Sequence, residues 1–169
     1  MNQGLLSTGN CAIIMAGGAA MNTAMTKEER EAFLAQPWIA VISIPEEGRG
    51  PLTVPVWYLY EPGGEVRIWT GHKSRKARLL AAAKRMSVCV QDPRPPYKYV
   101  SIEGPVSIEP VKFERDVCPM AFRYFGGEGG ERYLESLGGA AGVADDILVR
   151  VWPERWLTVD YAKLGLPPK

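Results

Sequence analysis

The chain has 169 residues, enough for one domain with a sizeable hydrophobic core. Its 20 basic and 19 acidic residues give a net charge of +1, so the charge balance gives no reason to expect binding to nucleic acid or to an anionic membrane. Three widely separated cysteines and a single histidine support neither a disulfide framework nor a zinc site. We therefore expect no metal site and a reducing, cytoplasmic setting.

The first two dozen residues differ from the rest of the chain. The mildly apolar stretch 13–20 lacks the positive start and the length of a secretory signal. It is also too short and too rich in glycine to span a bilayer. We expect residues 1–24 to be a loosely ordered extension and residues 25–169 to form a single domain.

The domain is predicted to open with a helix and continue as a strand meander. Thr26 followed by Glu29 has the spacing of a capping box, which marks a helix start. Pro55 lies within a run rich in β-branched and aromatic residues, where it indicates an edge, a bulge or a bend. The predicted strands, separated by tight turns, cover 38–44, 52–60 and 65–70.

The pattern then changes to a helical period and returns to strands. Strong helix formers follow Ser74 and extend to residue 85. Gly104 interrupts a long strand and is expected to form a bulge. Further strands are predicted at 86–91 and 97–108, and 147–151 with 155–159 is predicted as closing strand material. Helices with glycine-rich linkers are predicted at 113–125 and 131–137. About six short antiparallel strands with one helix inserted after the third favour a small barrel, mainly β with helices (α+β), over a parallel sheet.

The start of the second predicted helix carries an unusual charge pattern. Ser74 occupies the N-cap position, and Arg75 and Lys76 follow in the first turn, where the helix dipole disfavours cations. A bound phosphate would neutralise both charges and accept bonds from the first backbone N–H groups. The alternative is a solvated basic helix, since further cations follow at Arg78 and Lys84.

No motif indicates catalysis by side chains alone. The sequence has no nucleophile elbow, Walker loop or Rossmann glycine fingerprint, and His72 is the one possible histidine base. The aromatic residues of 54–60 either pack over a planar ring or fill the barrel core, which is the commoner use of such residues. We expect no catalytic side chain, and we expect a bound cofactor to carry any redox chemistry.

Four segments, taken in order and spacing, resemble the pyridoxamine 5'-phosphate oxidase-like superfamily. They are residues 54–58, 69–70, 74–76 and 99–104. The resemblance implies a six-stranded antiparallel split β-barrel of the FMN-binding type, with the cofactor in a groove between the two protomers of a homodimer. It implies that Arg75 and Lys76 hold the phosphate with help from Ser74 and Thr70, that Pro55, Val56, Trp57 and Trp69 line the isoalloxazine, and that Tyr99 replaces a flavin-contacting glutamine.

The function implied by this resemblance is that of an oxidoreductase. The Trp-Tyr strand and the basic helix look closest to a branch whose members use either FMN or the deazaflavin coenzyme of the 8-hydroxy-5-deazaflavin type. Such an enzyme moves hydride between the cofactor and a small conjugated or heteroaromatic substrate. Vitamin B6 is not expected as the substrate, because the arginine and histidine set that binds pyridoxal phosphate is missing near the C-terminus. The alternative is a non-catalytic protein of the same fold that binds or stores a flavin or a hydrophobic ligand.

Overall fold

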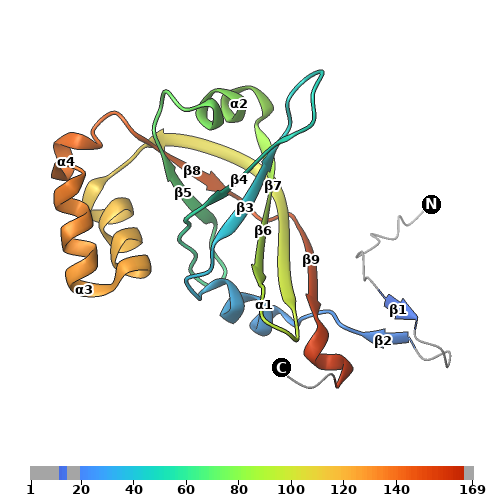
Figure 1. Ribbon diagram of the computed structural model, residues 1–169. Coiled ribbons are helices and arrows are strands. Elements are labelled where there is room, and N and C mark those ends of the chain that lie inside the picture. The colour runs from blue at the N-terminus through green and yellow to red at the C-terminus, as the bar shows by residue number, and fades with distance from the viewer. Residues whose placement is uncertain (1–11, 15–19, 166–169) are drawn as a thin grey trace.

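The computed structural model of the chain describes residues 12–14 and 20–165. Its centre is a curled antiparallel sheet in the order β4-β3-β6-β7-β8-β5, with β9 paired to β7 (Figure 1). The strands of this sheet are β3 (Ala40–Ile44), β4 (Leu52–Val56), β5 (Val66–Thr70), β6 (Arg85–Asp92), β7 (Lys98–Pro110), β8 (Ile147–Val151) and β9 (Arg155–Asp160). The helices are α1 (Lys27–Leu34), α2 (Arg75–Ala83), the π-helix η1 (Phe113–Val117), α3 (Cys118–Ser136), α4 (Gly139–Gly142) and the 3-10 helix η2 (Tyr161–Leu164).

The helices surround the sheet on three sides. Figure 1 shows α2 and α1 at opposite ends of the barrel, and α3 with α4 standing beside β5 and β8. None of the helices within the described residues is long and apolar enough to cross a membrane.

The sheet is curled into a half-barrel, and a β-bridge joins the segment that follows β4 to β5. The backbone N–H of Leu59 donates to the carbonyl of Arg67 at 2.8 Å, and the reverse bond is 2.9 Å long. Strand β7 is long enough to serve two parts of the sheet. Its first half pairs with β6 and β9, and its second half pairs with β8. The antiparallel split β-barrel predicted from the sequence, mainly β with added helices, is confirmed.

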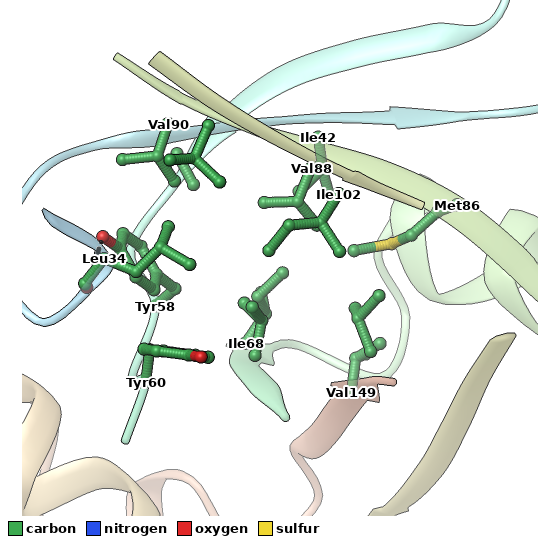
Figure 2. Close-up of a cluster of buried hydrophobic side chains, with 14 of the residues drawn as sticks. Leu34, Ile42, Tyr58, Tyr60, Ile68, Met86, Val88, Val90, Ile102 and Val149 are labelled. Carbon is green, nitrogen blue, oxygen red and sulfur yellow. Dashed lines mark hydrogen bonds between the residues drawn. The ribbon is translucent and has the colours of Figure 1, made fainter. Parts of the chain in front are cut away.

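Strand boundaries follow the alternation of side chains. In β3, Ala40, Ile42 and Ile44 are buried, and in β6 every second side chain from Met86 onward is buried. Figure 2 shows these side chains meeting those of α1, β5, β7 and β8 in one core. The strand predicted over 52–60 ends at Val56, because the chain leaves β3 there and continues towards β5. Pro55 fits this position, since β4 is an edge strand of the path.

The expected bulge at Gly104 is wrong. Gly104 pairs with Met86 in uninterrupted register with its neighbours on both sides. Instead, the connection between β8 and β9 crosses directly over this residue. A Cβ atom at Gly104 would lie 1.7 Å from the carbonyl oxygen of Trp152. Glycine is therefore required for a close backbone approach and not for a bulge.

Helix boundaries agree with the sequence signals. Glu29 donates its backbone N–H to the Thr26 hydroxyl at 3.2 Å, and Thr26 donates its own to the Glu29 carboxylate at 2.7 Å, so the capping box is complete. In α3 the glycine-rich linker is a kink at Gly126, where φ is +73° and ψ is −165°. The two halves of α3 fold back on each other, since Gly130 packs closely against the ring of Phe122.

The predicted N-terminal extension, residues 1–24, falls largely outside the described residues. The described parts include β1 (Ala12–Ile14) and β2 (Ala20–Asn22), which pair antiparallel. That the extension is loosely ordered stays a prediction.

Candidate cofactor-binding site

Most of the residues predicted to bind a cofactor come together around one hollow. This hollow has a volume of about 250 Å³ and lies among the end of β4, the end of β5, the start of α2, and α3. We call it the cofactor hollow. It is lined by Pro55, Val56, Trp57, Trp69, Thr70 and Lys76, all predicted, and by Gly71, Met120, Tyr133 and Asp146.

The end of β5 places two of these residues on opposite sides of the strand. Thr70 is buried and points to the same side as the core residues Val66 and Ile68. Trp69 points to the other side, where its indole N–H donates to the Asp146 carboxylate at 2.8 Å. This bond fixes the plane of the indole ring at the wall of the hollow, because a tryptophan has a single N–H donor.

The start of α2 forms the polar end of the hollow. The Ser74 hydroxyl accepts from the backbone N–H of Ala77 at 3.1 Å, and lies 3.4 Å from the Thr70 hydroxyl oxygen. The predicted N-cap is therefore confirmed. The first N–H groups of a helix lack carbonyl partners, and together with the helix dipole they favour an anion at this point.

The two cations of this turn have different surroundings. Arg75 forms an ion pair with Glu46 at 2.5 Å, so its charge is already compensated. Lys76 lines the hollow, is half-buried, and forms no ion pair within the described residues. Lys76 is therefore the cation of this turn that would attract a bound anion.

Tyr99 is the predicted residue that lies apart from this group. It is on β7, between Gln91 of β6 and Val159 of β9, and is not among the residues that line the hollow. A role for Tyr99 stays a prediction, and it requires a site that two protomers share.

The aromatic residues of 54–60 divide between core and pocket. Tyr58 and Tyr60 are buried in the barrel core. Trp57 leaves the core and joins an aromatic cluster on α3. Its ring stacks on Tyr124 with centroids 4.9 Å apart, and meets Phe125 and Tyr133 edge-on at 5.0 and 5.4 Å. Of the two roles considered for these aromatic residues, Tyr58 and Tyr60 fill the barrel core, whereas Trp57 lies at the wall of a pocket.

Helix α3 is held against the barrel by hydrogen bonds to the end of α1. The Arg123 guanidinium donates to the carbonyls of Ala35 and Leu34 at 2.8 and 3.0 Å, where the helix dipole favours a cation. The Tyr124 hydroxyl donates to the Trp38 carbonyl at 2.8 Å, and the Tyr58 hydroxyl to that of Leu34 at 2.8 Å. Burial raises the pKa of Tyr124 and that of Tyr58, so both phenols stay protonated as donors.

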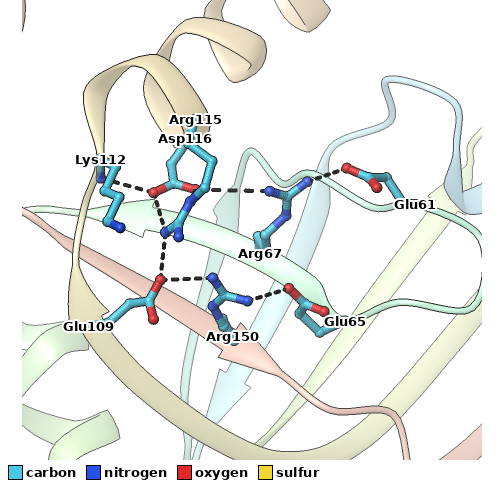
Figure 3. Close-up of polar contacts among 8 residues, drawn as sticks. All are labelled: Glu61, Glu65, Arg67, Glu109, Lys112, Arg115, Asp116 and Arg150. Atoms are coloured by element: carbon cyan, nitrogen blue, oxygen red, sulfur yellow. Dashed lines mark hydrogen bonds and ion pairs between the residues drawn. The ribbon is translucent and has the colours of Figure 1, made fainter.

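A polar network fastens the other end of the helical layer (Figure 3). The carboxylate of Asp116 is fully buried and receives two bonds from the Arg115 guanidinium, at 2.7 and 2.8 Å. It also accepts from the backbone N–H of Lys112 at 2.9 Å. Arg67 of β5 lies 3.9 Å away, and Glu109 links Arg115 to Arg150 of β8. The network therefore connects η1 to three strands of the barrel.

Four lining residues were not predicted from the sequence: Gly71, Met120, Tyr133 and Asp146. The aromatic residues that recur along the glycine-rich helix α3 are the sequence feature that could have indicated Tyr133. No local signal identifies Asp146, which reaches Trp69 across 77 positions of sequence. Within the described residues no group of three histidine, cysteine or acidic side chains could hold a metal ion.

Three solved structures with similar folds place the barrel among known proteins. The chain is similar to a conserved hypothetical protein from Mycobacterium tuberculosis, with a TM-score of 0.73, 25% identity, and coverage of 87% of this chain and 92% of the other. It is similar to an F420 reductase, with a TM-score of 0.55, 22% identity and coverage of 75% and 94%. It is also similar to a putative pyridoxamine 5'-phosphate oxidase from Listeria innocua, with a TM-score of 0.56, 14% identity and coverage of 78% and 96%.

The chain has the pyridoxamine 5'-phosphate oxidase-like split-barrel fold. No protein-family model matches it, and no curated protein matches it in sequence. The likeness of this chain to the three proteins therefore rests on the order of its strands and on the curl of its sheet. Because the identities are low, this likeness supports a flavin-binding fold and does not identify a substrate.

Proposed function

We propose that the protein is an oxidoreductase that uses a bound flavin-type cofactor, FMN or a deazaflavin coenzyme, for hydride transfer with a small conjugated or heteroaromatic substrate. The observation that carries the proposal is the composition of the cofactor hollow. Trp57 and Trp69 give it two indole walls suited to a planar ring, and the start of α2 with Lys76 gives it an anion-binding end. A flavin nucleotide combines a flat ring with a phosphate and so matches both parts of the hollow.

The residues present fit such a cofactor. Thr70, Ser74 and Lys76 would hold the phosphate, since their hydroxyl and ammonium groups lie at the start of α2. The Asp146 carboxylate would keep the Trp69 ring aligned with the cofactor ring. The cofactor supplies hydride transfer when bound, and the chain contributes binding, orientation and exclusion of water. The likeness in fold to an F420 reductase supports a flavin-type cofactor.

A non-catalytic binding or storage role is the second candidate. The observation in its favour is that Lys76 and Asp146 are the charged lining residues of the cofactor hollow, and Asp146 is bonded to Trp69. No lining residue is therefore placed as a dedicated acid or base. Turnover of a reduced cofactor in the presence of an electron acceptor separates an enzyme from a storage protein.

Replacing Lys76 with methionine should weaken binding of the phosphorylated cofactor by roughly 10- to 100-fold. The reason is that a charge-assisted hydrogen bond contributes about 1.5–3 kcal/mol, and Lys76 has no competing ion pair within the described residues. The measurement is a titration of apo-protein with FMN and, separately, with the deazaflavin coenzyme, followed by cofactor fluorescence. The cofactor that binds tightly to the unmodified chain is the one the protein uses.

Lys73→Met provides a matched control for this experiment. It removes the same charge from an exposed residue three positions away that does not line the hollow, so it should leave the affinity nearly unchanged. Equal losses in both variants would mean that the cations act through the general field of the helix. Unchanged affinity in Lys76→Met would remove Lys76 from the phosphate site.

We further propose that the protein is a homodimer, and that the outer face of the sheet forms the contact. A row of small and apolar residues crosses this face from strand to strand. It consists of Pro55, Val41, Cys89, Ser101 and Leu157, which are neighbours in register. Val41 and Leu157 are 40% and 39% exposed, and a second copy would cover them. Tyr99 lies two residues from Ser101 on the same face, which places it near the second protomer.

Val41→Glu should convert the dimer to a monomer, because it would bury an unpaired carboxylate on each side of the contact. Sedimentation velocity is the measurement. The unmodified protein should sediment at about twice 18.6 kDa, and the variant at the mass of one chain. A cofactor-loaded monomer of the unmodified protein would contradict the shared site.

A further inference from the structure

A second hollow opens beside the cofactor hollow and has a different chemistry. It has a volume of about 370 Å³ and is lined by Ile39, Pro55, Val56, Trp57 and Tyr133. We call it the apolar hollow. Four of these residues also line the cofactor hollow, so the two spaces adjoin along Pro55, Val56, Trp57 and Tyr133. Ile39 belongs to the apolar hollow alone.

None of the five lining residues carries a charge. The cofactor hollow differs in this respect, since Lys76 and Asp146 contribute to its wall. A charged group entering the apolar hollow would lose hydration without meeting an opposite charge in its lining. An uncharged ring would instead meet aliphatic surface from Ile39 and Val56 and aromatic surface from Trp57.

The aromatic surface is held in a fixed arrangement by α3. Trp57 is stacked on Tyr124 on one side, and Tyr133 meets it edge-on with centroids 5.4 Å apart. Phe125 supports both, with its ring 5.0 Å from Trp57 and 4.9 Å from Tyr133. Rings held in this way offer a preorganised wall to a flat ligand, which reduces the ordering needed when it binds.

We infer that the apolar hollow is the substrate subsite, that its ligands are uncharged planar ring compounds, and that Tyr133 is a specificity-determining residue at the boundary with the cofactor. This inference rests on the proposed function, because it assigns the second hollow by its contact with the first. It adds to the proposed function by restricting the small conjugated or heteroaromatic substrates to uncharged ones. Tyr133 contributes a wall to both spaces, so it sets how a substrate ring faces the cofactor.

The test uses two naphthoquinones of similar shape, one uncharged and one anionic. Menadione is uncharged, and 1,4-naphthoquinone-2-sulfonate carries a fixed negative charge. Each is titrated into protein saturated with its oxidised cofactor, and binding is followed by quenching of tryptophan fluorescence. We expect menadione to bind at least tenfold more tightly than the sulfonate. Equal or reversed affinities would overturn the inference.

Two variants locate the binding to this hollow. Tyr133→Ala should weaken menadione binding about tenfold, whereas Tyr97→Ala removes the same ring from an exposed residue outside both hollows and should have no effect. Ile39→Lys places a cation in the apolar hollow, where residue 39 is 46% exposed and a lysine is accommodated. It should shift the affinity ratio at least tenfold towards the sulfonate. An unchanged ratio in Ile39→Lys would contradict the assignment.

The same titrations distinguish a failure of the proposed function from a failure of the substrate class alone. Ile39 does not line the cofactor hollow, so Ile39→Lys should bind the cofactor as the unmodified protein does. Failure of the unmodified chain to bind either cofactor would overturn the proposed function. Normal cofactor binding without discrimination between the two quinones would overturn the substrate class alone.

Discussion

Gly104→Ala should destabilise the protein severely, by more than the 1–3 kcal/mol typical of an overpacked core. The added Cβ would lie 1.7 Å from the Trp152 carbonyl oxygen and 2.8 Å from its carbonyl carbon. Backbone atoms at these distances cannot move aside like the end of a flexible side chain. The connection between β8 and β9 would have to leave β7, and the backbone bond from Trp152 N–H to the Pro105 carbonyl, 3.0 Å long, would be lost with it.

Urea unfolding of the variant measures this effect, and Gly50→Ala is its matched control. An added Cβ at Gly50 meets nothing within 4 Å, so the control should unfold within about 0.5 kcal/mol of the unmodified chain. A Gly104→Ala protein with unchanged stability would show that the β8–β9 crossing lies farther from β7 than described.

Asp116→Asn should lower the free energy of unfolding by about 2–4 kcal/mol at pH 7, between the effect of one charged hydrogen bond and that of a broken buried ion pair. The substitution keeps the shape of the side chain but removes its charge. Arg115 would then lose one of its two charged acceptors and keep Glu109, and Arg67 would keep Glu61 as its ion-pair partner. Since η1 precedes α3 directly, the loss should also loosen the attachment of the helical layer.

The effect of this substitution should depend on pH in a defined direction. Burial acts to raise the pKa of Asp116, but the hydrogen bonds from Arg115, the Lys112 N–H and the charges of Arg115 and Arg67 outweigh it, so the pKa is lowered. A carboxylate of this kind stabilises the fold fully above the ordinary carboxyl pKa of about 4. The contribution is lost as the pH falls through the lowered folded-state pKa.

Urea unfolding at pH 7 and at successively lower pH checks both parts. The difference between the unmodified chain and Asp116→Asn should be largest at neutral pH and shrink in acid. Asp145→Asn removes a similar charge from an exposed residue and should change little at any pH. A difference that stays constant as the pH falls would show that the loss comes from packing and not from charge.

The fold could be predicted from the sequence because its signals are local. The capping box at Thr26 and the N-cap at Ser74 each depend on residues a few positions apart, and both are observed. The strand boundaries also agree to within a few residues. The exception is β4, which ends at Val56 because the chain must cross to β5, and this depends on the whole barrel.

The cofactor hollow was predictable in part for the same reason. Segments 55–57 and 69–76 supply two of its walls, and the resemblance of these segments to known split barrels identifies them. Partners distant in sequence were not predictable. Neither the ion pair of Arg75 with Glu46 nor the bond of Trp69 to Asp146 has a sequence signal, since 29 and 77 positions separate the partners. The role of Gly104 likewise depends on a crossing segment that no local pattern reveals.

The kink at Gly126 divides α3 into parts with separate duties. Arg123 and Tyr124, which bind the end of α1, precede the kink, whereas Tyr133 follows it. The anchor of the helical layer and the wall of the apolar hollow therefore lie on different segments of one helix. Substitutions after Gly126 can remodel the wall while the anchor stays intact. This separation makes the second half of α3 a place where ligand preference can evolve at little cost to the stability of the barrel.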